Sequence, residues 1–106
     1  MPLLLVETLP ELAQELEELL IQATEPALAA QIHTLTIVDR CRCGDDFCAT
    51  LYTEPRPQGA YGPNHRNIEL NASEGMIILD VVGSKIACVE VLYRDEIRKA
   101  LHSALP

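Results

Sequence analysis

The segment 76–92 constrains the fold more than any other part of the chain. It consists of two runs rich in valine, isoleucine and leucine on either side of a central Gly-Ser pair. Glycine at the first of two turn positions suits a type II′ turn, so the segment predicts a β-hairpin. In that hairpin Val82 faces Lys85, and Asp80 faces Ala87.

Both faces of this predicted hairpin are mostly apolar, because side chains alternate between the two sides of a strand. One face carries Met76, Ile78, Asp80, Val82, Ala87, Val89 and Val91. The other face carries Ile77, Leu79, Val81, Ile86, Cys88, Glu90 and Leu92. A lone hairpin cannot keep two apolar faces from water, so each face needs a cover. The sheet separates Asp80 from Glu90 in this arrangement, so they cannot form a catalytic pair.

The remaining sequence patterns predict an α+β fold in one domain, 1–106. The predicted segments are a helical region at 8–32, a cysteine-containing hairpin at 34–53, a proline-rich loop at 55–66, a sheet with the central hairpin at 67–92 and a helix at 94–104. We expect an antiparallel sheet of about five strands, with the N-terminal and C-terminal helices packed on one face. The other face is expected to be covered by a second copy of the chain or by the proline-rich loop.

The net charge of −8 is distributed unevenly along the chain. Residues 1–31 contain six glutamates and no lysine or arginine, whereas residues 32–106 carry all eight basic side chains and ten acidic ones. An acidic surface repels phosphate backbones, so we expect no nucleic-acid partner and favour a protein partner or a homodimer. No apolar run approaches the length of a membrane span, and the first residues do not resemble a leader peptide. Together these features predict a cytoplasmic protein without a membrane contact.

The sequence CRCGDDFC, which begins at Cys41, carries the sharpest chemical signal. On a hairpin with a four-residue loop, Cys43 faces Cys48 and Cys41 lies on the same face, so three thiols converge. Zinc favours four cysteine and histidine ligands, and either His65 or His33 is available as the fourth. Against a zinc site, the spacing differs from the paired Cys-x2-Cys of common zinc motifs, and cysteine is also a good small core residue.

The same cysteines admit a thiol-dependent redox role. Arg40 and Arg42 could stabilise a thiolate, and a disulfide between Cys43 and Cys48 is sterically conceivable. The negative charges of the adjacent Asp-Asp pair act in the opposite direction, and the Cys-x-x-Cys motif of thioredoxin-like enzymes does not occur. We expect the four cysteines to stay reduced in the cytoplasm, and we expect no cofactor other than zinc.

The proline-rich loop is the second candidate site, for a ligand with a carboxylate or a phosphate. Long loops often carry function, and this one offers several hydrogen-bond donors. They are Arg56, Tyr61, Asn64, His65 and Arg66. The three prolines of the loop also suit a rigid connector that shields the edge of the sheet. No local signature supports a Cys–His nucleophilic pair, and no phosphate-binding glycine loop or common hydrolase motif occurs.

Parts of the chain resemble a group of small uncharacterised bacterial proteins. The likeness rests on Cys41-x-Cys43-Gly44-Asp45-Asp46-x-Cys48 followed by Tyr52-Thr53, and on Gly75, Leu79-Asp80 and Val89-Glu90-Val91-Leu92-Tyr93. It covers residues 35–95 and implies a bacterial cytoplasmic protein with a Cys-x-Cys-Gly-Asp-Asp-x-Cys hairpin. The resemblance supplies no activity, ligand or partner.

These observations leave three functional hypotheses. The first is a non-enzymatic protein-interaction or regulatory module, favoured by the charge asymmetry and by the second apolar face of the hairpin. The second is a small zinc-binding module that uses Cys41, Cys43 and Cys48 with His65. The third is a thiol-dependent redox protein. We favour the first hypothesis, which assigns no catalytic residue, and metal analysis separates the second from the other two.

Overall fold

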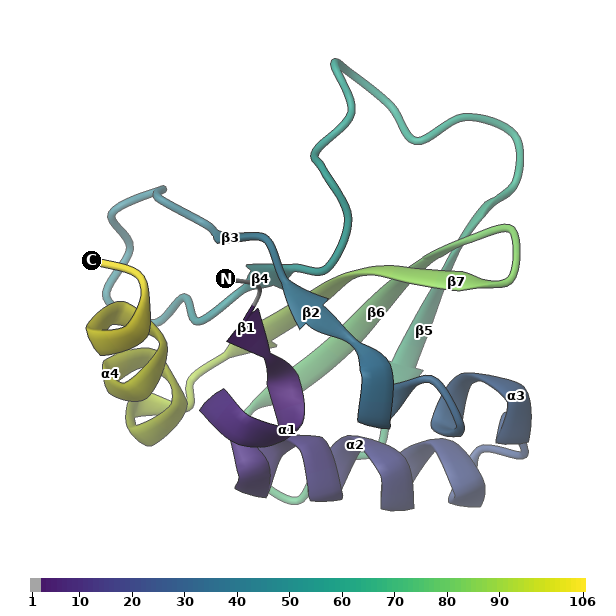
Figure 1. Ribbon diagram of the computed structural model, residues 1–106, viewed down its shortest axis with the longest axis horizontal. Coiled ribbons are helices and arrows are strands. Elements are labelled where there is room, and N and C mark those ends of the chain that lie inside the picture. The colour runs from purple at the N-terminus through teal and green to yellow at the C-terminus, as the bar shows by residue number, and fades with distance from the viewer. Residues whose placement is uncertain (1–2) are drawn as a thin grey trace.

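The computed structural model of the protein describes residues 3–106 (Figure 1). A two-residue strand and a helical region come first, the other strands follow, and a helix ends the chain. The helical elements are α1 (Leu5–Thr8), α2 (Pro10–Gln22), α3 (Pro26–Ala29), a 3₁₀ turn (Ile32–Thr34) and α4 (Asp95–Ala104). The strands are β1 (Leu3–Leu4), β2 (Thr36–Ile37), β3 (Asp39–Arg40), β4 (Leu51–Tyr52), β5 (His65–Leu70), β6 (Met76–Val82) and β7 (Lys85–Leu92). None of the helices in this described part is both long and apolar enough to cross a membrane.

Five of the strands form one antiparallel sheet in the order β3-β4-β7-β6-β5. The two remaining strands, β1 and β2, form a separate small sheet. Strand β4 pairs with β7, so that Leu51 faces Val89 across a long stretch of sequence. The predicted α+β fold with an antiparallel sheet of five strands is therefore confirmed.

Helices cover one face of this sheet, as the sequence predicts (Figure 1). Helix α2 buries Leu12, Leu16 and Leu20 at helical spacing, and α4 buries Ile97 and Leu101. They belong to one core with the sheet residues Leu51, Leu70, Ile77, Leu79, Val81, Ile86, Val89 and Val91. Removal of this aliphatic surface from water is the main source of stability for the fold.

The turn of the central hairpin has the predicted form. Gly83 has a φ of +64°, whereas Ser84 is not among the residues with positive φ. This combination is the one that a type II′ turn requires. Val82 faces Lys85 across the turn, so the first pair of the predicted register is confirmed.

Beyond the turn, the register differs from the prediction by one residue. A β-bulge at Ala87 places Asp80 opposite Cys88, and it places Ile78 opposite Glu90. A shift of one residue moves every following side chain of a strand to the other face. Glu90 therefore lies on the same face as Asp80, and the prediction that the sheet separates these two carboxylates is wrong.

The bulge divides the hairpin into one apolar face and one mixed face. The apolar face carries Ile77, Leu79, Val81, Ile86, Val89 and Val91, all of them in the helix-covered core. The mixed face carries Met76, Ile78, Asp80, Val82, Cys88, Glu90 and Leu92. The membership of the two faces therefore differs from the prediction, because the bulge gathers both carboxylates on one side. Five of the seven side chains on the mixed face are still apolar.

The segment that follows β4 holds the bulge in place. The amides of Thr53 and Glu54 both donate to the carbonyl of Ala87, at 3.0 and 3.3 Å. Thr53 is buried and also donates from Oγ1 to the carbonyl of Ile86 (2.7 Å). The carbonyl of the extra residue is thus satisfied, although a bulge removes its regular partner in the ladder.

Two glycines with nearly equal φ, Gly75 (+63°) and Gly83 (+64°), offer a matched test of backbone packing. A Cβ at position 75 would lie 2.3 Å from the carbonyl oxygen of Leu92, whereas a Cβ at position 83 would have no atom within 4 Å. We expect Gly83→Ala to cost only left-handed backbone strain, about 1–2 kcal/mol. Gly75→Ala is expected to cost about 2 kcal/mol more because of the overlap. Urea unfolding measures the loss of stability in each variant. Equal losses would contradict the close approach of position 75 to the carbonyl of Leu92.

Candidate functional site

The mixed face of the sheet forms the floor of an open pocket of about 420 Å³. Residues of the segment before β4 and of the proline-rich loop, the long excursion between β4 and β5 in Figure 1, complete its lining. The lining includes Cys41, Cys48, Tyr52, Tyr61, Asp80 and Glu90. The pocket therefore brings together cysteines of one segment and carboxylates of another.

Cys41, Cys43 and Cys48, the three-cysteine cluster, lie with their Sγ atoms within 4.8 Å of one another. The chain turns back between them, because Gly44 adopts a φ of +85° and the amide of Cys48 donates to the carbonyl of Asp45 (3.3 Å). All three cysteines are free thiols. The predicted convergence of three thiols is confirmed.

The sheet holds the two outer cysteines of the cluster. The amide of Cys41 donates to the carbonyl of Thr50 (2.9 Å), and Cys48 forms an isolated bridge with Leu92. Strand β3 ends at residue 40, so the loop between the two outer cysteines is longer than the predicted hairpin loop. Cys43 lies in this loop and is exposed, whereas Cys48 is buried.

The three thiols influence one another's protonation. Burial acts to raise the pKa of Cys48, but hydrogen bonding with Thr50 and with the other two thiols lowers it below its ordinary value. The backbone at Asp45 acts to lower the pKa of Cys43, but contact with Cys41, desolvation and contact with Cys48 together raise it to about 11. Of these two thiols, Cys48 is therefore expected to lose its proton before Cys43.

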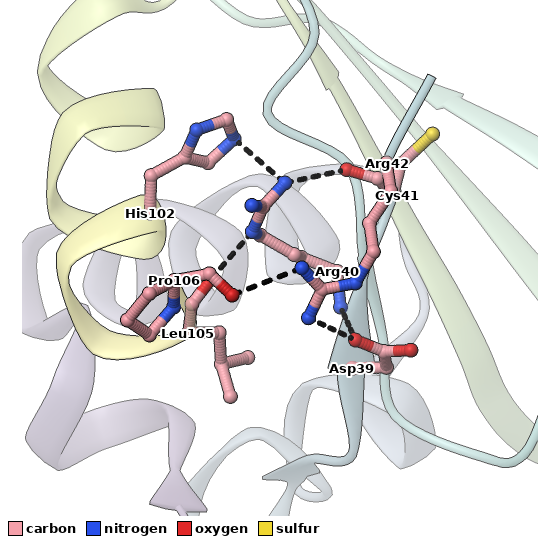
Figure 2. A network of polar contacts seen from close by, with 7 residues as sticks. All are labelled: Asp39, Arg40, Cys41, Arg42, His102, Leu105 and Pro106. Atoms are coloured by element: carbon pink, nitrogen blue, oxygen red, sulfur yellow. Dashed lines mark hydrogen bonds and ion pairs between the residues drawn. The ribbon is translucent and has the colours of Figure 1, made fainter. Parts of the chain in front are cut away.

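Arg40 and Arg42 connect the cluster segment to the end of α4 (Figure 2). Arg40 donates from Nε to the carbonyl of Leu105 and from Nη1 to the carbonyl of Cys41. Arg42 donates to the carbonyl of Pro106 (3.0 Å). Figure 2 shows the sulfur of Cys41 pointing away from both guanidinium groups. The two arginines thus position the backbone of the cluster segment, and their charges are directed at carbonyls that follow the helix.

Arg40→Ala is expected to lower the free energy of unfolding by about 1.5–3 kcal/mol, because a part-buried guanidinium loses its bonds to two carbonyls. Arg42→Ala is the matched control: it removes exposed contacts of the same kind and is expected to cost less than about 1 kcal/mol. Urea unfolding of the two variants checks this difference. Equal costs would show that the end of α4 is not held through Arg40.

Asp80 and Glu90 form a carboxylate pair on the floor of the pocket. They are diagonal neighbours on β6 and β7, a separation that long side chains can span. Asp80 is only 5% exposed, and its Oδ1 accepts hydrogen bonds from Nε2 of His65 (2.7 Å) and Nδ2 of Asn67 (2.6 Å). Two donors from β5 therefore compensate the buried charge of Asp80.

The pKa values of the two carboxyl groups are shifted in opposite directions. Burial acts to raise the pKa of Asp80, but hydrogen bonds with Glu90, His65 and Asn67 lower it below its usual range. Hydrogen bonding to Asp80, followed by burial, raises the pKa of Glu90 to about 7. Near neutral pH, Asp80 is therefore ionised while Glu90 is divided between its two protonation states.

The raised pKa of Glu90 predicts that the free energy of unfolding decreases as the pH rises toward neutrality. Between pH 4.5 and about 7, the folded state keeps a proton on Glu90 that the unfolded chain has lost, so the free energy of unfolding falls. Glu90→Gln removes this titration. We expect the variant to be more stable than the wild type by about 1 kcal/mol at alkaline pH, a value reduced for solvent screening of a partly exposed side chain.

Urea unfolding as a function of pH measures the effect of Glu90→Gln. The advantage of the variant is expected to disappear at acid pH, where the wild-type side chain is protonated in both states. Glu69→Gln is the control, because Glu69 is an exposed carboxylate on the neighbouring strand β5. If the free energy of unfolding depends on pH in the same way for the wild type and for Glu90→Gln, Asp80 does not raise the pKa of Glu90.

Two of the predicted loop residues, Arg56 and Tyr61, line the pocket. Tyr61 lies against His65, with ring centroids 4.7 Å apart, and the guanidinium of Arg56 lies 4.9 Å from the ring centroid of Tyr52. Burial is the main cause that raises the pKa of Tyr52 and of Tyr61, each to about 12. Both phenols are therefore neutral hydrogen-bond donors at physiological pH.

Two of the three remaining loop candidates, Asn64 and Arg66, have structural contacts away from the pocket, and the third, His65, is hydrogen-bonded to Asp80. Arg66 forms an ion pair with Glu25 at 3.1 Å, and the carbonyl of Asn64 accepts a hydrogen bond from the amide of Gly83. The five predicted donors therefore do not converge on a single carboxylate or phosphate site. Arg56 and Tyr61 line the pocket, whereas Arg66 contacts the helical region and Asn64 contacts the turn of the central hairpin.

Neither histidine considered as a fourth zinc ligand belongs to the cluster. His65 is hydrogen-bonded to Asp80, and His33 contacts Glu17 on α2. Among residues 3–106, the only group of three or more metal-ligating side chains is that of the three cysteines themselves. Any metal ion at this site would thus find three protein ligands in place.

Three of the six N-terminal glutamates are paired within the chain. The pairs are Glu15–Arg94, Glu17–His33 and Glu25–Arg66. Glu7, Glu11 and Glu18 are exposed. The charge asymmetry of the sequence is therefore smaller in the folded protein, because basic residues from the later part of the chain reach the helices.

Comparisons of the chain with protein-family models, with curated proteins and with solved structures found no match. Function is therefore inferred from the geometry of the site. The pocket combines two of the three convergent thiols, a carboxylate pair with one labile proton and two neutral phenols. The third thiol, that of Cys43, lies within 4.8 Å of the other two. Thiols of this kind can ligate a soft metal ion or exchange with a disulfide.

Proposed function

We propose that this protein is a small metal-binding module and that its three-cysteine cluster binds zinc. The observation that carries the proposal is the mutual distance of the three Sγ atoms, which is at most 4.8 Å. In a tetrahedral site with Zn–S bonds of about 2.3 Å, the sulfurs lie about 3.8 Å apart. Small side-chain movements would therefore bring the three sulfurs around one ion.

The setting of the cluster supports this proposal. Cys41 and Cys48 are fixed by hydrogen bonds and bridges to the sheet, and Arg40 and Arg42 hold the segment to the end of α4. A segment held in this way loses little conformational freedom when it binds an ion. Soft thiolate ligands select zinc or copper(I) over calcium and magnesium.

Metal analysis tests the proposal directly. Protein purified under reducing conditions, without chelator or added metal, is expected to contain about one equivalent of zinc. Substitution of Cys41, Cys43 or Cys48 by serine is expected to reduce the zinc content below about a tenth of an equivalent, because two thiolates hold zinc far more weakly than three.

Cys88→Ser is the matched control for these variants. Cys88 is also buried and lines the same pocket, but it lies outside the cluster, so its loss is expected to leave the zinc content unchanged. The proposal is wrong if the reduced wild-type protein binds no zinc even after incubation with the ion. It is equally wrong if the three serine variants keep as much zinc as Cys88→Ser.

A thiol-dependent redox role is the second candidate, favoured by the lowered pKa of Cys48 beside two further thiols. It uses the same cysteines, so bound zinc and a disulfide within the cluster exclude each other. The metal analysis therefore decides between them: a metal-free, reduced cluster would favour the redox role.

The protein-interaction and homodimer hypotheses stay predictions. They were motivated by a second apolar face and by an acidic N-terminal region. The bulge replaces that face with a mixed one, and ion pairs within the chain use three of the six glutamates. The likeness to small bacterial proteins and the cytoplasmic location also stay predictions.

A further inference from the structure

We propose that the metal centre is open, with its fourth coordination position facing the pocket and taking water or another small exchangeable ligand. This inference rests on the metal binding proposed above. A structural zinc site is closed by four protein ligands, whereas a site with three protein ligands leaves the fourth position to water or a substrate. The distinction decides whether the metal only stabilises the fold or can also bind a ligand.

The first step is the number of ligands that the chain supplies. Across residues 3–106, the group around the cluster contains three cysteines and no histidine, aspartate or glutamate at ligand distance. His65 is hydrogen-bonded to the buried Asp80, and its release would leave that carboxylate with one donor fewer. The protein therefore offers three ligands without breaking another buried contact.

The second step is the direction in which the cluster opens. Cys41 and Cys48 both line the pocket of about 420 Å³, which is large enough for several water molecules or a small organic ligand. Arg40 and the end of α4 lie beside the cluster segment, and the sulfur of Cys41 points away from the guanidinium of Arg40 (Figure 2). A fourth ligand therefore has its approach from the pocket.

The third step places Glu90 beside that approach. Leu51 faces Val89 and Cys48 faces Leu92, so this register makes Glu90 a diagonal neighbour of Cys48 on the same face of the sheet. Diagonal neighbours lie about 7–8 Å apart, and a glutamate side chain can span that distance. The pocket thus holds a carboxylate close to the fourth position, and this negative charge favours water and neutral ligands over anions.

Cobalt(II) in place of zinc provides the test, because the absorption bands of cobalt thiolate sites report the fourth ligand. The probe is azide, a small anion. In the wild-type protein we expect azide to change the cobalt bands, as a new ligand replaces water. In Glu90→Gln at alkaline pH we expect azide to bind about fivefold more tightly, since a like charge near the ligand is removed.

Two further variants serve as controls. Glu69→Gln removes an exposed carboxylate on β5 and is expected to leave the azide affinity unchanged. Asp45 lies between Cys43 and Cys48 and also lines the pocket, so its carboxylate is a candidate for closing the site. With Asp45→Asn we expect the cobalt bands and their response to azide to match those of the wild type.

The possible failures are distinguishable. If cobalt does not bind, the metal-binding proposal fails, and this inference fails with it. If cobalt binds but saturating azide leaves its bands unchanged, or changes them only in Asp45→Asn, the centre is closed and this inference alone is overturned. If azide binds Glu90→Gln and Glu69→Gln equally well, Glu90 does not face the fourth position.

Discussion

The backbone contact between Ala87 and the segment after β4 decides what the central hairpin presents to the pocket. Two amides, those of Thr53 and Glu54, converge on one carbonyl and so stabilise a strand with one residue more than its partner. Without this extra residue, Glu90 would point into an aliphatic core covered by helices. With it, Asp80 and Glu90 become neighbours, and the core keeps an unbroken apolar face. The β-bulge at Ala87 therefore has two effects: it keeps the buried face of the hairpin apolar, and it places the polar side chains on the other face.

Much of the fold could be predicted because it depends on local patterns. Glycine and serine at the turn, helical spacing of leucines and a short distance between cysteines all act over a few residues. The convergence of Cys41, Cys43 and Cys48 needs only a chain reversal at Gly44, so it survived the difference between the predicted hairpin and the observed loop. The position of the helices followed from the need to cover an apolar face of the hairpin.

The register of the hairpin could not be predicted from the turn alone, because the donors that hold the bulge come from a distant segment. One signal was nevertheless present. Placing residues 80, 88 and 90 on one face leaves Ile77, Leu79, Val81, Ile86, Val89 and Val91 together on the other, and a face made wholly of aliphatic side chains buries better than two mixed ones. The partner of His65 was unpredictable for a related reason, since Asp80 reaches it only through the pairing of β5 with β6.

The link between Arg40 and the carbonyl of Leu105 has a consequence for how the molecule loses order. Helix ends are the first parts of a protein to fray, well before a sheet separates. The spacing of the three sulfurs depends on a segment that is fastened to such an end. On warming, the distances between the three sulfurs should therefore begin to vary while the strands are still intact. A molecule that binds the final turn of α4 would reduce this variation without touching the cysteines.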